Sequence, residues 1–268
     1  MKDVDFYEKA SSEFLELASE IRLKILFSLR QKKSRVSTLA KKFNVTAQEV
    51  HRNFDRMSSS GLIAKDKDGA YKITTFGRAI CSQIPSIAFL SENKDYFDTH
   101  TFGDIPPKFI RRIGDLDDCE YVSGVSMVFE RWKRIYTNSN EYIFNILTET
   151  PLDLMELILK RVKKGIRYRH IISENATIPK GRRKLLQKMG FDKMLESGMI
   201  ERRMLQNVSV SIIMNEKEAA IMFPTEEGEP DLRGMFYSID PYFHDWTLDY
   251  FKHSWFISDP FKEFKLSE

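Results

Sequence analysis

The stretch Val36–Gly61, VSTLAKKFNVTAQEVHRNFDRMSSSG, has the pattern of two short helices joined by a turn. The apolar residues are Val36, Leu39, Ala40 and Phe43 in the first half, and Val50, Phe54 and Met57 in the second half. Their i, i+3, i+4, i+7 spacing gives each helix one face that a core can bury. Thr46 and Glu49 form a capping box, which starts the second helix after a turn at Asn44 and Val45. The stretch therefore predicts a helix–turn–helix.

The face of the second helix opposite Phe54 is basic and rich in amide and hydroxyl groups. Such a face, backed by a tight apolar one, is what a protein needs to read the major groove of DNA. We expect Gln48 and Arg52 to contact base edges, with His51 and Arg56 close to bases or phosphates. The residues that we predict to bind DNA are Thr46, Gln48, His51, Arg52, Asn53, Arg56, Lys65 and Lys67.

A two-stranded wing is predicted directly after this helix. Gly61 ends the helix and a strand begins at Leu62 and Ile63. Residues 65–69 (KDKDG) then turn the chain into a returning strand at 71–73. Lys65 and Lys67 at the wing tip, together with Thr46 at the start of the helix, are expected to contact DNA phosphates.

Three amphipathic helices are expected around the motif. One covers residues 4–17, and one covers 20–29, capped by Ser19 and packing Ile21, Ile25, Leu26 and Leu29 inward. The third is expected over residues 76–90, capped by Thr75. The apolar stripes of 4–17 and 76–90 need partners beyond a small winged helix, so we expect a homodimer.

The distribution of charge along the chain fits an N-terminal DNA-binding domain followed by a larger domain. Residues 1–80 hold 16 Lys and Arg against 10 Asp and Glu, whereas the rest of the chain holds 26 basic and 29 acidic residues. This basic first third suits contact with a phosphate backbone.

Cys81 and Cys119 lie far apart, outside any metal or redox spacing, which favours a reducing compartment. Without a signal segment or an apolar run of about 18 residues, we expect a cytoplasmic protein that does not enter the membrane.

The remainder of the chain has the pattern of an α/β domain. After an irregular stretch at 91–118, a helix is expected over 122–137. Strands are expected at 141–147, 166–172, 201–205, 208–214 and 219–223, and helices at 152–164 and 180–189. Strands that alternate with helices predict a sheet with right-handed crossovers. We expect a winged helix–turn–helix domain at 1–90, a helical linker at 91–140 and an α/β sensor-type domain at 141–268 that ends in an aromatic-rich helix.

Several of these segments resemble known regulators. The helix at 20–29 (EIRLKILFSL) is similar to the opening helix of ArsR-like winged-helix regulators, with Arg22 in the place of their arginine before an Ile-Leu pair. Residues 95–116 (DYFDTHTFGDIPPKFIRRIGDL) resemble the start of the middle domain of archaeal methanogenesis and filamentation regulators, through His100, Ile105-Pro106 and Gly114-Asp115-Leu116. Residues 208–224 and 242–258 resemble the end of TrmB-type sensor domains. The resemblance implies an archaeal transcription regulator, and we interpret His100 itself as a structural histidine.

No catalytic motif accompanies the α/β pattern. Some such sheets belong to phospholipase-D-like hydrolases, but no His here starts their His-x-Lys-x4-Asp motif. The sequence also has no P-loop, no GxGxxG after a strand, no Gly-x-Ser-x-Gly and no cluster of His, Cys and Asp ligands. We therefore expect no enzymatic activity, no metal and no cofactor.

A small-molecule effector can bind beyond the carboxyl ends of parallel strands. The polar residues that follow the first two predicted strands are Thr148, Glu149, Ser173 and Glu174. They are our candidate ligand-binding residues.

Two basic runs lie at 160–169 and 180–188. We interpret them as helix faces exposed to solvent. The alternatives are additional contact with the DNA backbone and a binding site for an anion.

Two functions remain open from the residues. The first is a sequence-specific transcription regulator that binds double-stranded DNA as a homodimer, with one recognition helix (46–60) per subunit in the major groove. The alternative is a ligand-binding or protein-interaction module whose winged helix serves dimerisation.

Overall fold

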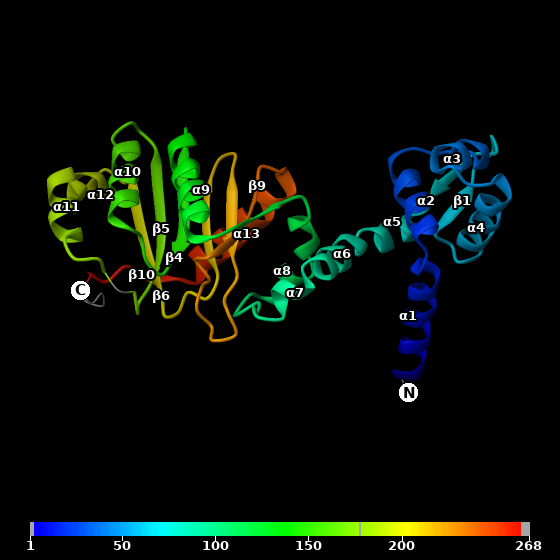
Figure 1. The fold of residues 1–268 in the computed structure, drawn as a ribbon, viewed down its shortest axis with the longest axis horizontal. Coiled ribbons are helices and arrows are strands. Elements are labelled where there is room, and N and C mark those ends of the chain that lie inside the picture. The colour runs from blue at the N-terminus through cyan, green and yellow to red at the C-terminus, as the bar shows by residue number, and fades with distance from the viewer. Residues whose placement is uncertain (1–2, 177, 264–268) are drawn as a thin grey trace. The chain divides into compact units, whose positions relative to one another are not determined.

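The computed structural model describes residues 3–176 and 178–263, and the chain divides into two compact units, residues 1–85 and 86–268 (Figure 1). The first boundary therefore lies at Pro85 rather than at residue 90. The stretch 91–140, predicted as a linker, is instead part of the second unit. The reason is that it supplies a strand and several helices to that unit's sheet and core. No helix among the described residues is long and apolar enough to cross a membrane.

The first unit is a winged helix–turn–helix. Its elements are α1 (Asp3–Leu17), α2 (Glu20–Gln31), α3 (Val36–Phe43), α4 (Ala47–Ser59), β1 (Ile63–Lys65), β2 (Tyr71–Ile73) and α5 (Thr75–Cys81). The turn between α3 and α4 depends on Asn44, which adopts the left-handed region with φ 54°. Thr46 caps α4 by accepting a hydrogen bond from the Glu49 N–H at 3.1 Å, as the capping box predicts. Gly61, at φ 77°, follows the end of α4 in the conformation expected of a helix-terminating glycine.

The predicted apolar sets form the core of this unit. Leu39 and Ala40 of α3 and Val50, Phe54 and Met57 of α4 are buried against Ile25, Leu26 and Leu29 of α2. The ring of Phe54 lies 4.3 Å from that of Tyr71 on the wing, so the helix–turn–helix and the wing share one core. Ser34 also bridges to Tyr71, through N–H···O bonds of 3.0 and 2.8 Å, which ties the wing to the segment before α3.

The helix predicted over residues 76–90 is two helices in the structure. α5 ends at Cys81 and α6 covers Ile84–Glu92. Pro85 explains the break, because proline has no N–H to continue the helical ladder and its ring clashes with the preceding turn. The cap is also shifted by one residue, since Thr74 rather than Thr75 accepts the N–H of Gly77, at 2.9 Å.

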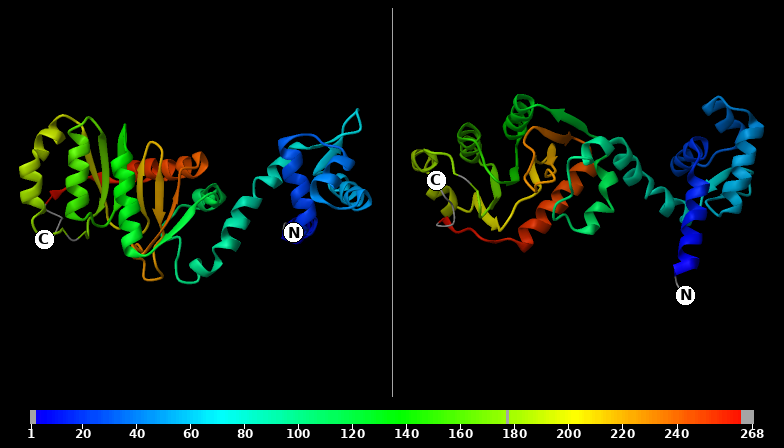
Figure 2. Two further views of the ribbon diagram at one scale, coloured as in Figure 1. Left: turned by 45° about the horizontal axis from the view of Figure 1, so that its top comes forward. Right: turned by 60° about the horizontal axis from the view of Figure 1, so that its bottom comes forward.

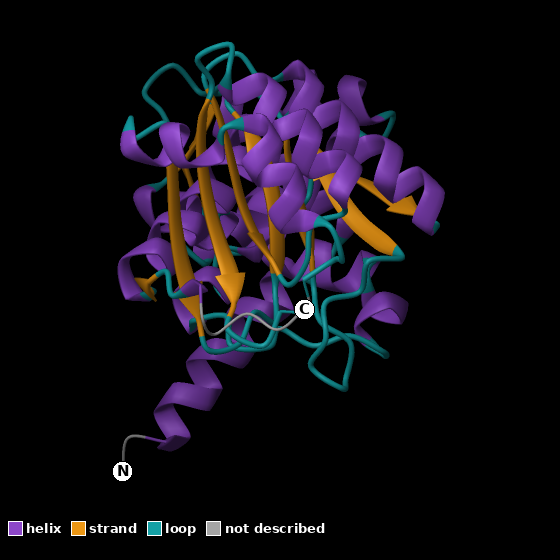
Figure 3. Ribbon diagram, turned by 90° about the vertical axis from the view of Figure 1, so that its left-hand side faces the viewer, coloured by secondary structure: helices purple, strands orange, loops and turns teal. Residues whose placement is uncertain are grey.

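The second unit is an eight-stranded mixed sheet with helices on both faces (Figure 2, Figure 3). The strand order is β10-β6-β5-β4-β7-β8-β9-β3, and among the strands of the described residues the pairs β4–β5 and β5–β6 are parallel and the others antiparallel. The strands are β3 (Glu120–Ser123), β4 (Tyr142–Leu147), β5 (Arg167–Ser173), β6 (Ile200–Leu205), β7 (Ser211–Asn215), β8 (Ala219–Met222), β9 (Gly234–Ser238) and β10 (Asp259–Pro260). The helices are α6, α7 (Lys94–Phe97), α8 (Pro107–Ile110), α9 (Val125–Asn138), α10 (Leu152–Val162), α11 (Arg182–Met189), α12 (Phe191–Glu196) and α13 (Pro241–Ile257), with a 3-10 turn at Ile113–Leu116.

Alternate residues of the central strands enter two separate cores. On β7, Ile213 packs in the core that contains α9 and α10, while Ile212 and Met214 pack in the core that contains α13. This is the two-residue period of a strand that is buried on both faces. The predicted aromatic helix is confirmed as α13, where Phe243, Trp246 and Phe251 are buried and Leu248 and Trp255 are partly buried.

Several predictions for this unit were wrong in detail. The helix predicted from Val122 begins at Val125, because residues 120–123 form the edge strand β3. The stretch 91–118, predicted as irregular, contains α7, α8 and the turn at 113–116. The last strand predicted was 219–223, yet a further strand, β9, follows it and pairs with β8. Short strands of four or five residues, and helices of four to six, give too little periodicity to be recognised in a sequence.

Candidate nucleic-acid interface

The recognition helix α4 presents two unengaged polar side chains near its N-terminus. Gln48 and Arg52 are both exposed, one helical turn apart, on the side opposite the buried Phe54. Within the described part of the chain, neither forms a hydrogen bond or an ion pair. Both side chains are therefore free to extend toward a ligand. In a helix–turn–helix the N-terminal part of the recognition helix is the part that meets base edges.

The other predicted residues on α4 already have partners. His51 Nδ1 lies 2.8 Å from Asp55 Oδ2, so an exposed carboxylate shares its face of the helix. Asn53 is half-buried and donates to the carbonyl of Glu49 at 3.0 Å. Thr46 uses its hydroxyl oxygen for the helix cap. Asn53 is thus turned back onto its own helix, while His51 and Thr46 remain exposed.

Arg56 is held by α1 rather than left free. Its Nε and Nη2 donate to the two carboxylate oxygens of Glu16 at 2.6 and 2.9 Å. The hydrogen bonds from Arg56 hold the pKa of the Glu16 carboxyl below its ordinary value. This bidentate pair fixes α1 against α4. The prediction that Arg56 contacts bases or phosphates did not anticipate this partner, because Glu16 lies 40 residues earlier in the chain.

The wing tip carries two exposed lysines, and its turn is held by ion pairs with a lysine from outside the wing. Lys65 and Lys67 are both exposed, and Lys65 Nζ lies 5.8 Å from the centre of the Tyr71 ring. The turn between them is held from outside the wing, because Lys33 Nζ lies 3.2 Å from Asp66 and 2.9 Å from Asp68. These two aspartates raise the pKa of Lys33. The ion pairs of Lys33 with Asp66 and Asp68 were not predicted, because nothing in the KDKDG sequence indicates a distant lysine partner.

A second polar region lies at the carboxyl ends of the parallel strands of the other unit. Thr148, Glu149 and Ser173 line an open cavity of about 730 Å³, together with Asp104, Asn175, Ala176, Asn207, Val208, Ser209, Glu227, Gly228, Glu229, Pro230 and Leu232. Its volume lies within the roughly 300–1,000 Å³ usual for small-molecule pockets. The fourth predicted residue, Glu174, does not line the cavity, and its backbone N–H donates to Leu205 at 2.8 Å.

His100 is packed into the second unit. Its ring stacks on Tyr96 with centres 3.8 Å apart, and its Nε2 lies 3.2 Å from Asp231 Oδ2. Its Nδ1 lies 2.9 Å from the Tyr96 carbonyl. Both ring nitrogens are therefore used in anchoring the segment that precedes α8, which agrees with the structural interpretation of this histidine.

Comparison with known proteins gives a family match for the N-terminal part of the chain. The geometry of α3, α4 and the wing defines the first unit as a winged helix–turn–helix domain. Residues 14–90 match the sequence model of the methanogenesis regulatory protein FilR1, N-terminal domain. This agrees with the predicted relation to archaeal methanogenesis regulators, whereas residues 95–116, on which that resemblance was based, lie outside the matched range. No curated protein matches the chain.

Solved structures show only distant similarity. TrmBL2, described as an archaeal chromatin protein with a novel mode of DNA binding, is 12% identical, with a TM-score of 0.41 over 91% of this chain and 94% of that one. Nuc from Salmonella typhimurium, a phospholipase D family member, is 11% identical, with a TM-score of 0.40 over 55% and 100%. Phosphatidylserine synthase from Haemophilus influenzae Rd KW20 is 10% identical, with a TM-score of 0.39 over 53% and 39%. At these TM-scores the similarities establish no shared function.

Proposed function

We propose that this protein is a sequence-specific transcription regulator that reads double-stranded DNA with α4. The observation that carries the proposal is the pair Gln48 and Arg52, exposed and unengaged on a helix whose opposite face is fixed in the core by Phe54. Arginine and glutamine are side chains that hydrogen-bond bidentately to guanine and adenine edges. The match of residues 14–90 to a regulatory family and the net charge of +6 over residues 1–80 support the same function.

The remaining contacts follow from the winged fold. Lys65 and Lys67 at the wing tip and Thr46 at the start of α4 would bind phosphates, and His51 would lie beside them. Arg56 is assigned a different role from the one first expected, because its guanidinium is engaged by Glu16. It would act as a positioning residue that sets α4 relative to α1.

The proposal includes a homodimer. Phe6, Tyr7, Phe14 and Leu15 of α1 are each more than 60% exposed, which leaves an apolar surface on an otherwise polar helix. A second copy of the chain would cover this surface and present two recognition helices to half-sites about one helical turn of DNA apart.

The second unit would serve as a sensor without catalytic activity. A small-molecule effector would bind in the cavity that contains Thr148, Glu149 and Ser173, at the end of the sheet where β4 meets both a parallel and an antiparallel neighbour. The cytoplasm is the compartment in which such a regulator would meet the chromosome.

The salt dependence of binding to duplex DNA tests the proposal against the alternative of a winged helix used for dimerisation. A DNA reader loses affinity steeply as salt rises, because each neutralised phosphate releases about 0.9 counterion. A protein-interaction module would show weak binding with a flat salt dependence. The latter result would overturn the proposal.

A further inference from the structure

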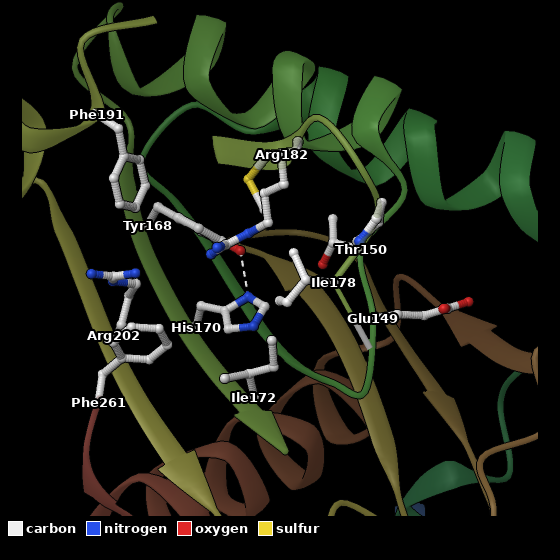
Figure 4. A pocket seen from close by; sticks show the side chains of 12 residues that line it. Glu149, Thr150, Tyr168, His170, Ile172, Ile178, Arg182, Phe191, Arg202 and Phe261 are labelled. Carbon is white, nitrogen blue, oxygen red and sulfur yellow. Dashed lines mark hydrogen bonds between the residues drawn. The ribbon is translucent and has the colours of Figure 1, made fainter. Parts of the chain in front are cut away.

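A small internal pocket in the second unit contains two arginines that face the same space (Figure 4). Arg182 begins α11 and Arg202 lies on β6, and their side chains are only 9% and 15% exposed. His170 of β5 lies beside them and is buried, with its Nδ1 2.5 Å from the Tyr168 hydroxyl. The free volume is about 20 Å³, which is enough for about one water molecule.

The positive charge in this pocket is only partly balanced. Both guanidinium groups share one carboxylate, that of Glu263, whose oxygens lie 3.3 Å from Arg182 Nη1 and 3.1 Å from Arg202 Nη1. The Glu263 side chain is itself 56% exposed. Glu149, the other acidic residue of the pocket, directs its carboxyl group away from the two arginines (Figure 4). Buried cations are costly unless fully paired, so the arginines favour a further negative charge.

A hydroxyl group in the same pocket lacks a partner. The Thr150 hydroxyl is buried and has no hydrogen-bond partner among the described residues. In Figure 4 it points toward Ile178, whose side chain lies between Thr150 and His170. Buried polar groups are nearly always hydrogen-bonded, and an unpaired one destabilises the fold. A ligand that extends from the arginines to this side of the pocket would accept a hydrogen bond from Thr150.

The segment that carries Glu263 joins the sheet through a very short strand. It is anchored by β10, a strand of two residues that pairs with Arg203 and Met204 of β6. Phe261 then covers Arg202, with the guanidinium carbon 3.7 Å from the ring centre. So short a strand is held by few hydrogen bonds, so it can leave the sheet at small cost. Its departure would open the pocket and free both arginines.

We propose that Arg182, Arg202 and Thr150 form a binding site for a small organic anion bearing a carboxylate or phosphate group. The anion takes the place of the Glu263 carboxylate between the two arginines, and residues 259–263 act as a displaceable lid. The pocket is separate from the cavity assigned to an effector by strand topology, although Glu149 lines both. It stands on its own geometry and does not depend on whether α4 reads DNA.

Isothermal titration calorimetry of the full chain with inorganic phosphate, and separately with acetate, tests the proposal. Glu263→Gln removes the resident charge and keeps the side-chain shape, so this variant should bind one of the two anions at least tenfold more tightly than the wild type does. The anion that gains shows which of the two groups the site prefers. Glu130→Gln, on an exposed part of α9, is the matched control and should not alter binding.

Two further variants, made in the Glu263→Gln background, locate the site. Arg202→Gln should abolish the gained binding, and Thr150→Val should weaken it about tenfold, which is the loss of one hydrogen bond to a charged group. Thr150→Val removes an unpaired hydroxyl, so it should not lower the thermal midpoint without anion and serves where Arg202→Gln fails to fold. Equal binding of both anions by Glu263→Gln, Glu130→Gln and the wild type would overturn the proposal, as would full binding by Thr150→Val.

Discussion

Arg56 of the recognition helix donates two hydrogen bonds to Glu16 of α1, from Nε at 2.6 Å and from Nη2 at 2.9 Å. The pair joins two helices that are 40 residues apart in sequence, and the Glu16 side chain is 15% exposed. One basic residue on α4 thus holds that helix in place. Gln48 and Arg52 remain as the side chains that can read a sequence.

Breaking this pair should loosen α1 more than it weakens DNA reading. Because Arg56 is 46% exposed, solvent screens the interaction, and Glu16→Gln should cost about 1 kcal/mol of stability. Hydrogen exchange of α1 and α4 amides should accelerate, while affinity for selected DNA falls less than tenfold. Glu8→Gln, an exposed change on the same helix, is the control. Unchanged exchange in Glu16→Gln would contradict a positioning role.

The wing lysines should contribute charge without sequence preference. Lys65→Ala and Lys67→Ala should each lower the slope of log affinity against log salt by about one and weaken all DNA sequences alike. Binding titrations at several salt concentrations measure both effects. If either variant changed the preferred sequence and left the salt slope intact, that lysine would be a base contact instead.

The buried His170 should make the second unit sensitive to acid. Burial, and then the charges of Arg182 and Arg202, lowers the pKa of this imidazole to about 3, below its ordinary value near 6.5. Between these values only the unfolded chain takes up the proton, so stability is full above about pH 6.5 and is lost as the pH falls toward 3. His170→Asn should reduce the stability difference between about pH 7 and 5 by about 2 kcal/mol.

Tryptophan fluorescence reports this effect directly. The three tryptophans of the sequence, Trp132, Trp246 and Trp255, all lie in the second unit, so urea unfolding followed by fluorescence isolates its stability. A comparison at both pH values should show the smaller difference in the variant. Equal pH dependence in His170→Asn and the wild type would show that another group causes the acid sensitivity.

The exposed apolar residues of α1 should hold two chains together. Phe14→Asp places a charge where Phe14 is 61% exposed, so it should shift the protein to monomer without unfolding the first unit. Light scattering at micromolar concentration measures the mass. A monomeric wild type would refute the homodimer, and a dimeric variant would move the interface away from α1.

The sequence predicted the first unit better than the second because its signals are local. The capping box at Thr46, the glycine at 61 and the apolar periods of α3 and α4 all act within a few residues, and the structure contains each of them. The break before α6 was missed, although Pro85 in the middle of the predicted helix is a recognised signal for one.

The parts that escaped prediction depend on distant contacts or short segments. β3 is an edge strand that pairs with β9, and β9 also pairs with β8, while their sequences of four and five residues carry little pattern. Arg56 and Glu16, and likewise Glu263 with Arg182 and Arg202, meet across 40 to 81 residues. Thr148, Glu149 and Ser173 line one cavity as predicted, because parallel strands bring their carboxyl ends to one edge, whereas Glu174 does not line it.

The most direct measurement of sequence reading by α4 is binding of Gln48→Ala and Arg52→Ala to a duplex selected from random DNA by the wild type. Each variant should lose about tenfold to a hundredfold in affinity for that duplex, with little loss for unrelated DNA. Arg78→Ala, an exposed arginine on α5, should bind as the wild type does. Selected-site affinity that survives in both Gln48→Ala and Arg52→Ala would contradict recognition by α4.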